Sequence, residues 1–425
     1  MSRRVVVTGL GVVAPNGVGV PAFLDALKNG RSGIKYMPEY QELNFNCQVC
    51  GIPEFALADL KGYLSEVMLH GLRGSTIGYA VKAAADAWLD AGNTLNNEEI
   101  FWETGCVFGN SVADTDAMKR VIELIDAKQA RKLGSRMVEQ LMNSGATAYV
   151  SGLLGLGNRI ITNSAACATG SQAVLMGYEY IKHGMAKRMV TGSNEYIDPY
   201  IFGAFDSMRI LARKFNHAPH QASRPMSATA GGFVPGSGAG ALILEDLEFA
   251  LARNAVIYAE VLGGQSNSGG QRNGGSMTAQ NTAGVVNCIR DAMRNAGIEG
   301  TDIDLVSGHL TATIADKMEI ENWATALNRY GDDFPLTNSV KSMIGHCLSA
   351  AGSIEIVALI LQIMHKFVHP NINLEDPNPE ILKIVGADRL PTKCINKNIN
   401  IAAKANFGFG DINTCLIFSK YENNG

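Results

Sequence analysis

The sequence predicts an α/β protein with mainly parallel sheets, and three observations lead to this prediction. Strand-like and helix-like stretches alternate along the whole chain, beginning with a β-branched segment at 4–13 that ends near glycine. Residues 76–92 have helical periodicity and a glycine stop, and 101–109 read as another strand before a helical pattern at 170–183. Short stretches of the first half also recur in the second half in the same order.

The composition excludes several classes of protein. The chain has 425 residues, of which 46% are hydrophobic and 18% charged, so it can bury a large core. Its net charge of -4 offers no concentrated basic surface for nucleic acid. No run of about 18 uncharged apolar residues appears, so we expect no membrane span. Cys47 and Cys50 form an isolated Cys-x-x-Cys without a second pair at metal spacing, so we expect no metal site.

The eight cysteines are scattered, which does not suggest a disulfide framework. The first residues run directly into a strand-like segment, so we expect no signal peptide. Together these features predict a protein of the reducing cytoplasm.

The internal repeat predicts two duplicated halves, residues 1–252 and 253–425. The stretch 86–92 resembles 291–297, and 161–164 resembles 336–339. The opening strand at 5–7 corresponds more loosely with 256–258. The first half is about 30 residues longer between its two marks, which we assign to a polar, helical-looking insertion near 110–140. Duplicated units of this kind bring the ends of equivalent strands together near a pseudo-twofold axis.

Cys167 is the candidate nucleophile. It lies in the segment 163–171, which leads from a strand into an apolar helical pattern. The partial positive charge at a helix N-terminus favours a thiolate, and a sharp strand-to-helix turn exposes the sulfur. The alternative for any cysteine is a small buried core residue, and the cysteines that fit it well are Cys106, Cys288 and Cys415.

The second half supplies candidate partners for this cysteine. The repeat aligns its segment with 338–346, which contains Lys341 and His346. His309 follows a strand-like stretch at 304–306, so its loop is expected to converge on the same pocket. One cysteine with two histidines is a set suited to nucleophilic catalysis. The histidines expected to be structural are His70, His183, His217, His220, His365 and His369.

A series of short motifs runs through the chain in a fixed order. They are 5–11, 29–34, 166–170, 222–225, 238–240 with Glu245, 341–343 with 345–346, 350–352 and 407–410. Together they resemble the β-ketoacyl-(acyl carrier protein) synthases of the thiolase superfamily, of the elongating Cys-His-His type. The resemblance implies a thiolase-like fold, with two duplicated α/β halves in a five-layer αβαβα arrangement.

The resemblance also implies a reaction. Cys167 takes an acyl chain as a thioester, and a malonyl extender then loses carbon dioxide and attacks the acyl carbonyl to give a 3-oxoacyl product. His309 and His346, as neutral donors, suit the malonyl thioester oxygen. The backbone N–H groups of Cys167 and Phe409 suit the acyl oxygen as an oxyanion hole.

Further residues receive supporting roles from the resemblance. Lys341 is expected near His346, paired with Glu319, and Thr311 and Thr313 are expected to face the malonyl carboxylate. Phe409 resembles the family's gating phenylalanine, with Phe407 as the alternative for that role. The candidates for docking an acidic carrier protein are Arg209, Arg213 and Lys214, and a solvated charge cluster is the alternative.

Partners and cofactors follow from the same resemblance. The substrates are carried on the phosphopantetheine of acyl carrier protein, and no separate cofactor is expected. The chain is expected to form a dimer, either with a second copy or with a related inactive subunit, through an edge strand near 158–162.

Some positions depart from the family's usual pattern. Leu310 and Ile314 replace the glycine and proline of the usual His-Gly-Thr-x-Thr-Pro, and the loop is one residue shorter before Asp316. Asp411 and Ile412 replace Gly-Thr after the gate, and 230–231 is Ala-Gly where Arg-Asp is common. These changes predict specialisation away from housekeeping fatty acid elongation, toward a polyene or other secondary product. The acyl chain length is not predicted.

Three other functions fit the sequence less well. A chain-length-factor-like partner subunit has the same fold but lacks the nucleophile, which this chain retains with both histidines and the lysine. A thiolase acting on coenzyme A esters needs a second catalytic cysteine near the C-terminus, where this chain has 407–410. A cysteine protease does not use a lysine and histidine from a duplicated half.

Overall fold

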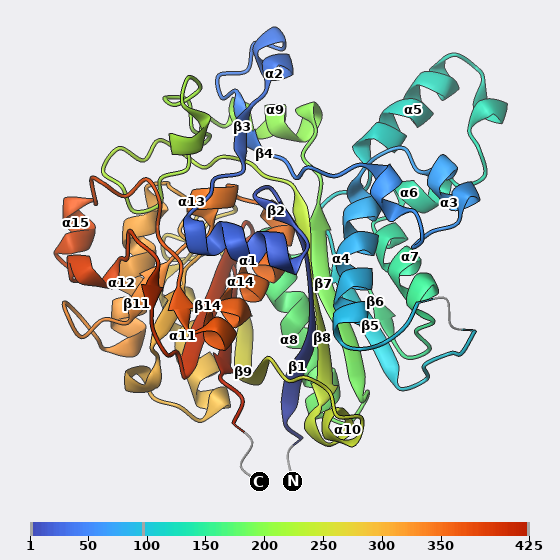
Figure 1. Ribbon diagram of the computed structural model, residues 1–425. Coiled ribbons are helices and arrows are strands. Elements are labelled where there is room, and N and C mark those ends of the chain that lie inside the picture. Colours follow the sequence, from blue (N-terminus) through green and yellow to red (C-terminus); the bar gives the residue numbers. More distant parts are fainter. Residues whose placement is uncertain (1–2, 96–97, 423–425) are drawn as a thin grey trace.

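One mixed sheet forms the centre of the molecule (Figure 1). The computed structural model describes residues 3–95 and 98–422, and eleven strands of this part join in the sheet. The first half contributes, in spatial order, β1 (Val5–Ala14), β8 (Gly238–Asp246), β7 (Arg188–Glu195), β5 (Thr104–Gly109) and β6 (Ile160–Ile161). The second half contributes β9 (Ala259–Ser268), β15 (Ile412–Ser419), β14 (Ile401–Gly408), β10 (Leu305–Ser307) and β11 (Leu336–Asn338).

The two halves have the same strand order and the same directions. In each, the second strand of the order is antiparallel to both of its neighbours, and the last three are parallel. The prediction of mainly parallel sheets was therefore too strong. In the second half the reason is direct: β14 passes into β15 through a short turn, which can only produce an antiparallel pair.

Helices cover the sheet in layers. Helices α4 (Thr76–Asp90) and α7 (Gly145–Leu154) pack outside the first half, and α11 (Thr282–Ala296) and α12 (Ala315–Leu327) outside the second. Helices α8 (Thr169–Lys182) and α14 (Ala351–His365) lie between the two halves and contact strands of both. The layers therefore follow the predicted αβαβα order of a thiolase-like fold.

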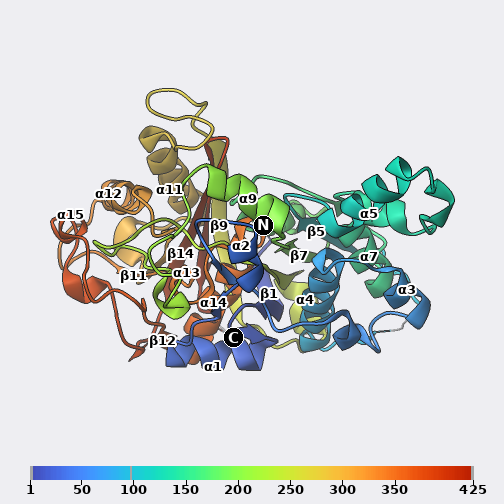
Figure 2. The ribbon, with the colours of Figure 1, turned by 90° about the horizontal axis from the view of Figure 1, so that it is seen from above.

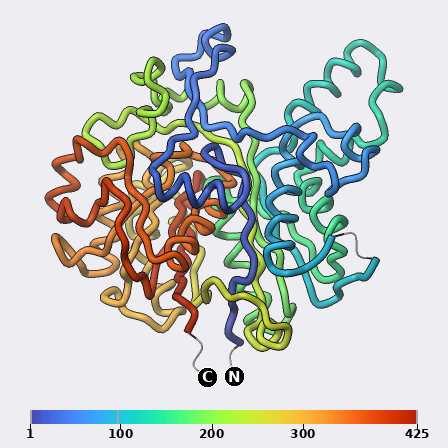
Figure 3. Tube along the Cα trace, in the orientation of Figure 1, coloured from blue at the N-terminus to red at the C-terminus, as the bar shows by residue number. Residues whose placement is uncertain are grey.

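The repeat marks lie on equivalent elements. The stretches 86–92 and 291–297 end α4 and α11, and the stretches 161–164 and 336–339 accompany β6 and β11. The predicted match of 256–258 with the opening strand at 5–7 is a few residues too early, because the equivalent strand β9 begins at Ala259. Strands β1 and β9 pair over only three residues, and the start of β1 and the end of β15 lie on opposite sides of β9. The two ends of the described chain are therefore close together (Figure 3). The predicted boundary after residue 252 lies between α10 and β9.

The insertion near 110–140 is helical, as its composition indicated. It contains α5 (Thr115–Asp126), the 3₁₀ turn η2 (Ala130–Lys132) and α6 (Met137–Leu141), and it projects from the layers (Figures 1 and 2). The other elements are β2 (Gly17–Val18), α1 (Val20–Asn29), β3 (Ile34–Tyr36), α2 (Pro38–Glu42), β4 (Val49–Gly51), η1 (Leu57–Leu60), α3 (Glu66–Gly71), α9 (Pro199–Ser207), η3 (Pro219–Gln221), α10 (Leu247–Ala252), η4 (Gly300–Asp302), α13 (Lys341–Ile344), η5 (Leu348–Ala350), β12 (Phe367–Val368), α15 (Pro379–Leu382), η6 (Ala387–Arg389) and β13 (Ile395–Asn396).

Helix α14 is the most apolar helix of the central layer. The stretch Leu348–His365 has the length and composition to cross a membrane, but 89% of it is buried inside the protein. Its apolar side chains belong to the largest core cluster, which also includes residues of β1, β8 and α8. Burial between the two halves explains its composition.

The two central helices approach each other most closely near their N-terminal ends. A Cβ atom on Gly170 would lie 2.4 Å from the backbone nitrogen of Ser353, and one on Gly352 would lie 2.4 Å from the backbone nitrogen of Ser171. The two contacts are reciprocal, as a pseudo-twofold axis requires. Glycine at both positions therefore sets the distance between α8 and α14.

We expect Gly352→Ala to lower the free energy of unfolding by about 1–3 kcal/mol, because the new methyl group forces the two helices apart. Gly152→Ala is a matched control, since Gly152 lies in α7 with no heavy atom within 4 Å of an added Cβ. The control should be neutral or stabilising by up to about 1 kcal/mol. Chemical denaturation measures both, and equal stability of the two variants would contradict the close-contact role.

Candidate active site

Cys167 lies on a sharp turn between β6 and α8. Ala166, immediately before it, has a φ of 46°, a left-handed conformation that is unfavourable for alanine. The turn is held by Thr169, whose hydroxyl accepts a hydrogen bond from the backbone N–H of Ala165 at 2.8 Å and donates to the carbonyl of Ala166 at 2.7 Å. Gly408 packs against the turn, where a Cβ would lie 2.7 Å from the carbonyl oxygen of Ala165. The predicted strand-to-helix elbow is therefore present.

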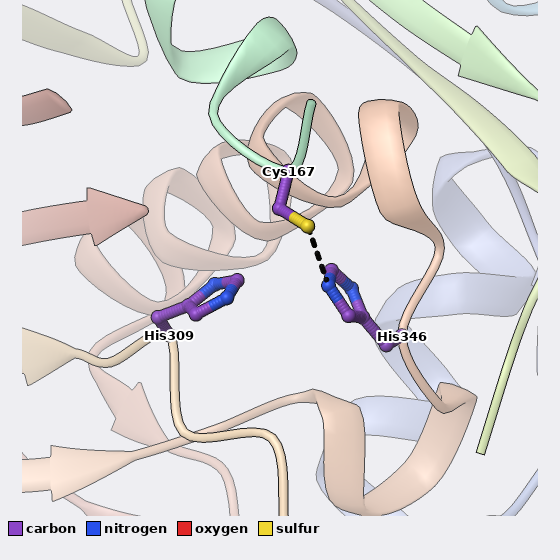
Figure 4. Close-up of side chains that lie close together, drawn as sticks. All are labelled: Cys167, His309 and His346. Carbon is purple, nitrogen blue, oxygen red and sulfur yellow. Dashed lines mark hydrogen bonds between the residues drawn. The ribbon is translucent and has the colours of Figure 1, made fainter. Parts of the chain in front are cut away.

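Two histidines face the sulfur (Figure 4). His346 Nε2 lies 3.1 Å from Cys167 Sγ, and the three potential ligand atoms of Cys167, His309 and His346 all lie within 4.8 Å of one another. The two imidazole rings are nearly perpendicular, with centroids 5.1 Å apart. Each side chain follows the end of a parallel strand, β6, β10 or β11. The structure thus brings together the three residues that the repeat assigned to one pocket.

The three side chains line a cavity of about 430 Å³. Thr311 and Thr313 line it on the second-half side, and Phe409 lies close to Phe205, with ring centroids 6.4 Å apart. The remaining lining residues are Ser111, Ala166, Met208, Ile210, Phe233, Thr278, Gln280, Ile314, Ala315, Leu348 and Phe407. Both Phe407 and Phe409 touch this cavity, but Phe407 is buried and packs with the second-half core.

Burial favours the neutral thiol of Cys167 over the thiolate. Burial raises the pKa of Cys167 to about 11, although Lys341 and the backbone N–H groups of Phe409 and Cys167 act in the opposite direction. Desolvation of the sulfur therefore opposes the effect expected of the helix N-terminus, which stays a prediction.

Both histidines rest as neutral imidazoles. Burial lowers the pKa of His346 to about 3, and the positive charge of Lys341 contributes in the same direction. Burial also lowers the pKa of His309 well below its ordinary value, and Lys341 and His346 again add to this effect. A neutral imidazole has one N–H donor and one acceptor nitrogen, as the sequence analysis required of both residues.

The predicted pair of Lys341 with Glu319 is not formed. Lys341 Nζ makes a buried ion pair with Glu355 of α14, and Lys404 Nζ lies 2.7 Å from the second oxygen of the same carboxylate. Glu319 instead accepts hydrogen bonds from the backbone N–H groups of His309 and Leu310, both at 2.6 Å. Glu319 lies on α12, which packs against the His309 loop. The prediction was wrong because the helix whose carboxylate reaches Lys341 is α14.

The altered loop after His309 keeps its position through buried carboxylates. Leu310 has a φ of 23° and Ala312 a φ of 63°, conformations that favour glycine. Besides Glu319, Asp316 accepts hydrogen bonds from the backbone N–H groups of Thr311 at 2.8 Å and Ala312 at 3.1 Å. These hydrogen bonds hold the loop that carries His309 in the absence of the family's glycine and proline.

Several site residues escaped the sequence analysis. Glu355, Lys404 and Asn406 are buried around the two histidines, and none belonged to the motifs considered. One signal was available: Glu355 is the only acidic or basic residue, apart from a terminal histidine, in the apolar stretch 348–365. A buried carboxylate in such a helix requires a partner.

The remaining candidates lie outside the cavity. Arg209, Arg213 and Lys214 are exposed, on a segment whose neighbours Met208 and Ile210 line the cavity. In the described part of the chain, the one group of side chains compact enough for a metal ion is the Cys167, His309 and His346 set itself. The cysteines assigned to the core, Cys106, Cys288 and Cys415, are buried, as are Cys47 and Cys50.

Comparison with known proteins identifies the family. Residues 2–64 and 73–250 match the beta-ketoacyl synthase N-terminal domain, and residues 258–375 match the beta-ketoacyl synthase C-terminal domain. The chain is 33% identical over 422 residues to the 3-oxoacyl-[acyl-carrier-protein] synthase 2 of Vibrio harveyi, covering 98% of this chain and 99% of that protein. The chain belongs to the β-ketoacyl synthase family.

Solved structures agree with this assignment. One is a type II polyketide synthase acyl-carrier protein in complex with its ketosynthase bound to the hexaketide, whose matching chain has a TM-score of 0.87 at 29% identity. Another is the ishigamide ketosynthase/chain length factor, with a TM-score of 0.88 at 28% identity. Each match covers 99% of this chain and 100% of the other.

Alkylation of Cys167 should follow its raised pKa. The thiolate fraction increases about tenfold for each pH unit below a pKa of about 11, so the rate of reaction with iodoacetamide should rise steadily between pH 7 and 9.5. A Cys394→Ser background removes the exposed competing cysteine, and peptide mapping follows the label. A rate that is constant from pH 6 to 8 would mean that the helix N-terminus, not burial, determines the ionisation.

Proposed function

We propose that the chain is a β-ketoacyl-(acyl carrier protein) synthase that extends an acyl chain held on Cys167 by decarboxylative condensation with a malonyl group. The observation that carries this proposal is the contact of 3.1 Å between Cys167 Sγ and His346 Nε2, with His309 facing the same sulfur. The family supports the reaction type. The names of its relatives and neighbours supply the substrate class, acyl groups on acyl carrier protein.

The first half-reaction transfers an acyl group between two sulfur atoms. Cys167 Sγ attacks the thioester carbonyl and forms a new carbon–sulfur bond, and the bond to the carrier's phosphopantetheine sulfur breaks. The thiol loses its proton to solvent before the attack, helped by Lys341 and the backbone N–H groups of Phe409 and Cys167, and the departing sulfur takes a proton from solvent. His346 keeps its proton on Nε2, which lies 3.1 Å from the sulfur and can donate to it.

The second half-reaction forms the carbon–carbon bond. The malonyl carboxylate leaves as carbon dioxide, and its electron pair becomes an enolate whose oxygen accepts hydrogen bonds from His309 and His346. The enolate carbon attacks the acyl carbonyl, whose oxygen is stabilised by the backbone N–H groups of Cys167 and Phe409. The carbon–sulfur bond to Cys167 then breaks, and the released thiolate takes a proton from solvent.

The proposed site needs no separate cofactor, since the phosphopantetheine arm belongs to the substrate carrier. Thr311 and Thr313 line the cavity where the malonyl carboxylate would lie. The departures at Leu310 and Asp411 support specialisation for a polyene or another secondary product. A catalytically inactive chain-length-factor role is disfavoured by the assembled Cys-His-His set. The free cysteines of the described chain are compatible with a cytoplasmic location.

His309→Ala and His346→Ala should separate the two half-reactions. Each variant should still form the acyl-Cys167 thioester, detected by intact-protein mass, because the elbow and the oxyanion N–H groups remain. Each should lose about 10²–10³ in condensation rate, since one donor to the enolate oxygen is removed. Cys167→Ser provides the control without a thiol. Equal losses in acylation and condensation for both variants would show that the histidines activate the thiol instead.

Charge reversal at Arg213 and Lys214 should raise the apparent KM for carrier-bound substrates about tenfold and leave small thioester analogues unaffected. Both side chains are exposed on the segment that flanks the cavity, and carrier proteins are acidic. Reversal of Lys393, exposed on another part of the surface, is a matched control. An equal rise in the apparent KM for carrier-bound substrates and small analogues would mean that Arg213 and Lys214 are a solvated charge cluster without a docking role.

We also propose a dimer through β6, which ends the strand order of the first half next to Cys167. Ile160 of this strand is 38% exposed, and an open edge strand invites pairing with another chain. A stable interface of this kind should exceed roughly 2,000 Å². Light scattering should therefore show a dimer with a second copy or with a related subunit. A folded, active monomer at micromolar concentration would exclude it.

A further inference from the structure

We infer that Asn406 fixes the tautomer of His309, so that the imidazole proton is on Nε2 and points into the cavity. Asn406 lies on β14 and is fully buried. Its side-chain nitrogen Nδ2 lies 3.2 Å from His309 Nδ1 and 2.9 Å from an oxygen of Glu355. Its oxygen Oδ1 accepts a hydrogen bond from the hydroxyl of Ser171 at 2.5 Å. This positioning role rests on the proposed function, in which His309 must donate to an enolate oxygen.

The orientation of the amide follows from the charge of Glu355. An ionised carboxylate has only acceptor oxygens, so the group of Asn406 that faces Glu355 must be the NH₂. Two buried cations, Lys341 and Lys404, keep this carboxylate ionised, and the pKa of Glu355 is lowered to about 2. Rotation of the amide by 180° would place its oxygen against the negative charge. The NH₂ orientation is therefore the stable one.

The protonation of His309 follows from that orientation. The amide NH₂ has two hydrogens, one for Glu355 and one for His309 Nδ1. Nδ1 must then accept, which requires an unprotonated nitrogen, and a neutral imidazole carries its single proton on the other nitrogen. The buried His309 is held neutral by desolvation and by Lys341. Nε2 therefore presents an N–H to the cavity without any rearrangement before the reaction.

Lys404 contacts both Glu355 and the backbone that leads into His309. Its ammonium lies 2.7 Å from Glu355 and within 3.2 Å of the carbonyl oxygens of Ser307 and Gly308, which immediately precede His309. β10 and β14 are adjacent parallel strands, with Ser307 opposite Lys404. Residues 404 and 406 share one face of β14, since alternate residues of a strand point the same way. The same strand thus positions both the backbone and the ring of His309.

Asn406→Asp tests the inference, because the new side chain has nearly the same shape but at most one hydrogen to donate. Beside the ionised Glu355 this carboxyl stays protonated and donates its single hydrogen to Glu355, so the oxygen that faces His309 Nδ1 can only accept. It should accept a hydrogen from Nδ1 and move the His309 proton from Nε2 to Nδ1. We expect condensation to fall by about 10²–10³, as for loss of the donor itself, with acylation of Cys167 retained. In ¹⁵N-histidine-labelled enzyme at neutral pH, the His309 signals should show Nδ1 unprotonated in the wild type and protonated in the variant. His309→Ala assigns those signals.

Ser171→Ala is the matched control. It removes the hydrogen bond to Asn406 Oδ1 but leaves both Nδ2 contacts, so the tautomer should stay on Nε2 and condensation should change by no more than about fivefold. A wild-type spectrum with the His309 proton on Nδ1 would overturn the inference, even if Asn406→Asp does not fold. An Asn406→Asp enzyme with unchanged tautomer and condensation would also overturn it. A wild-type protein with the expected tautomer but no condensation would instead refute the proposed function and leave the positioning role standing.

Discussion

The close crossing of α8 and α14 is the constraint on which the site depends. Gly170 and Gly352 allow the two helices to approach with backbone atoms in contact, which neither position would permit with a side chain. α8 begins directly after Cys167, and the segment before α14 carries His346. Because both helices also contact both halves of the sheet, the distance between them fixes the distance between the nucleophile and its nearest histidine. A small shift here would separate sulfur and imidazole.

Burial at this crossing also affects the charges of the site, and the buried ion pair of Lys341 with Glu355 acts on them. Burying Cys167 and two histidines favours their neutral forms, which suits N–H donors but suppresses the thiolate. Lys341 acts on both, since its charge lowers the pKa of the thiol and of the imidazoles. A lone buried ammonium would be costly, and Glu355 provides its counter-ion from the same central helix. One ion pair therefore supports the nucleophile and keeps the donors neutral.

Much of the fold and of the triad could be predicted from the sequence because duplication leaves local marks. The helix ends at 86–92 and 291–297 repeat, and the Cys167 segment aligns with the segment of Lys341 and His346. Partners that depend on packing could not be predicted in this way. Glu319 and Glu355 are both buried acids on second-half helices, and only the positions of α12 and α14 decide which one meets Lys341. The prediction of mainly parallel strands was too strong for a related reason, since strand direction depends on the connection between strands and not on residue type.

Two of the departures from the family's usual pattern, Leu310 and Asp411, follow one physical rule. Leu310 and Asp411 both adopt a positive φ, where a residue other than glycine costs on the order of 1 kcal/mol or more. In each case a buried carboxylate accepts nearby backbone N–H groups: Glu319 at the His309 loop, and Asp411 itself, which bonds to Gln271 at 3.0 Å and Asn281 at 2.8 Å. An intramolecular hydrogen bond contributes about 0.5–1.5 kcal/mol, which is comparable to such strain. The lost glycines are thus replaced by anchoring hydrogen bonds, and Asp411 joins the turn after Phe409 to the loop that precedes α11.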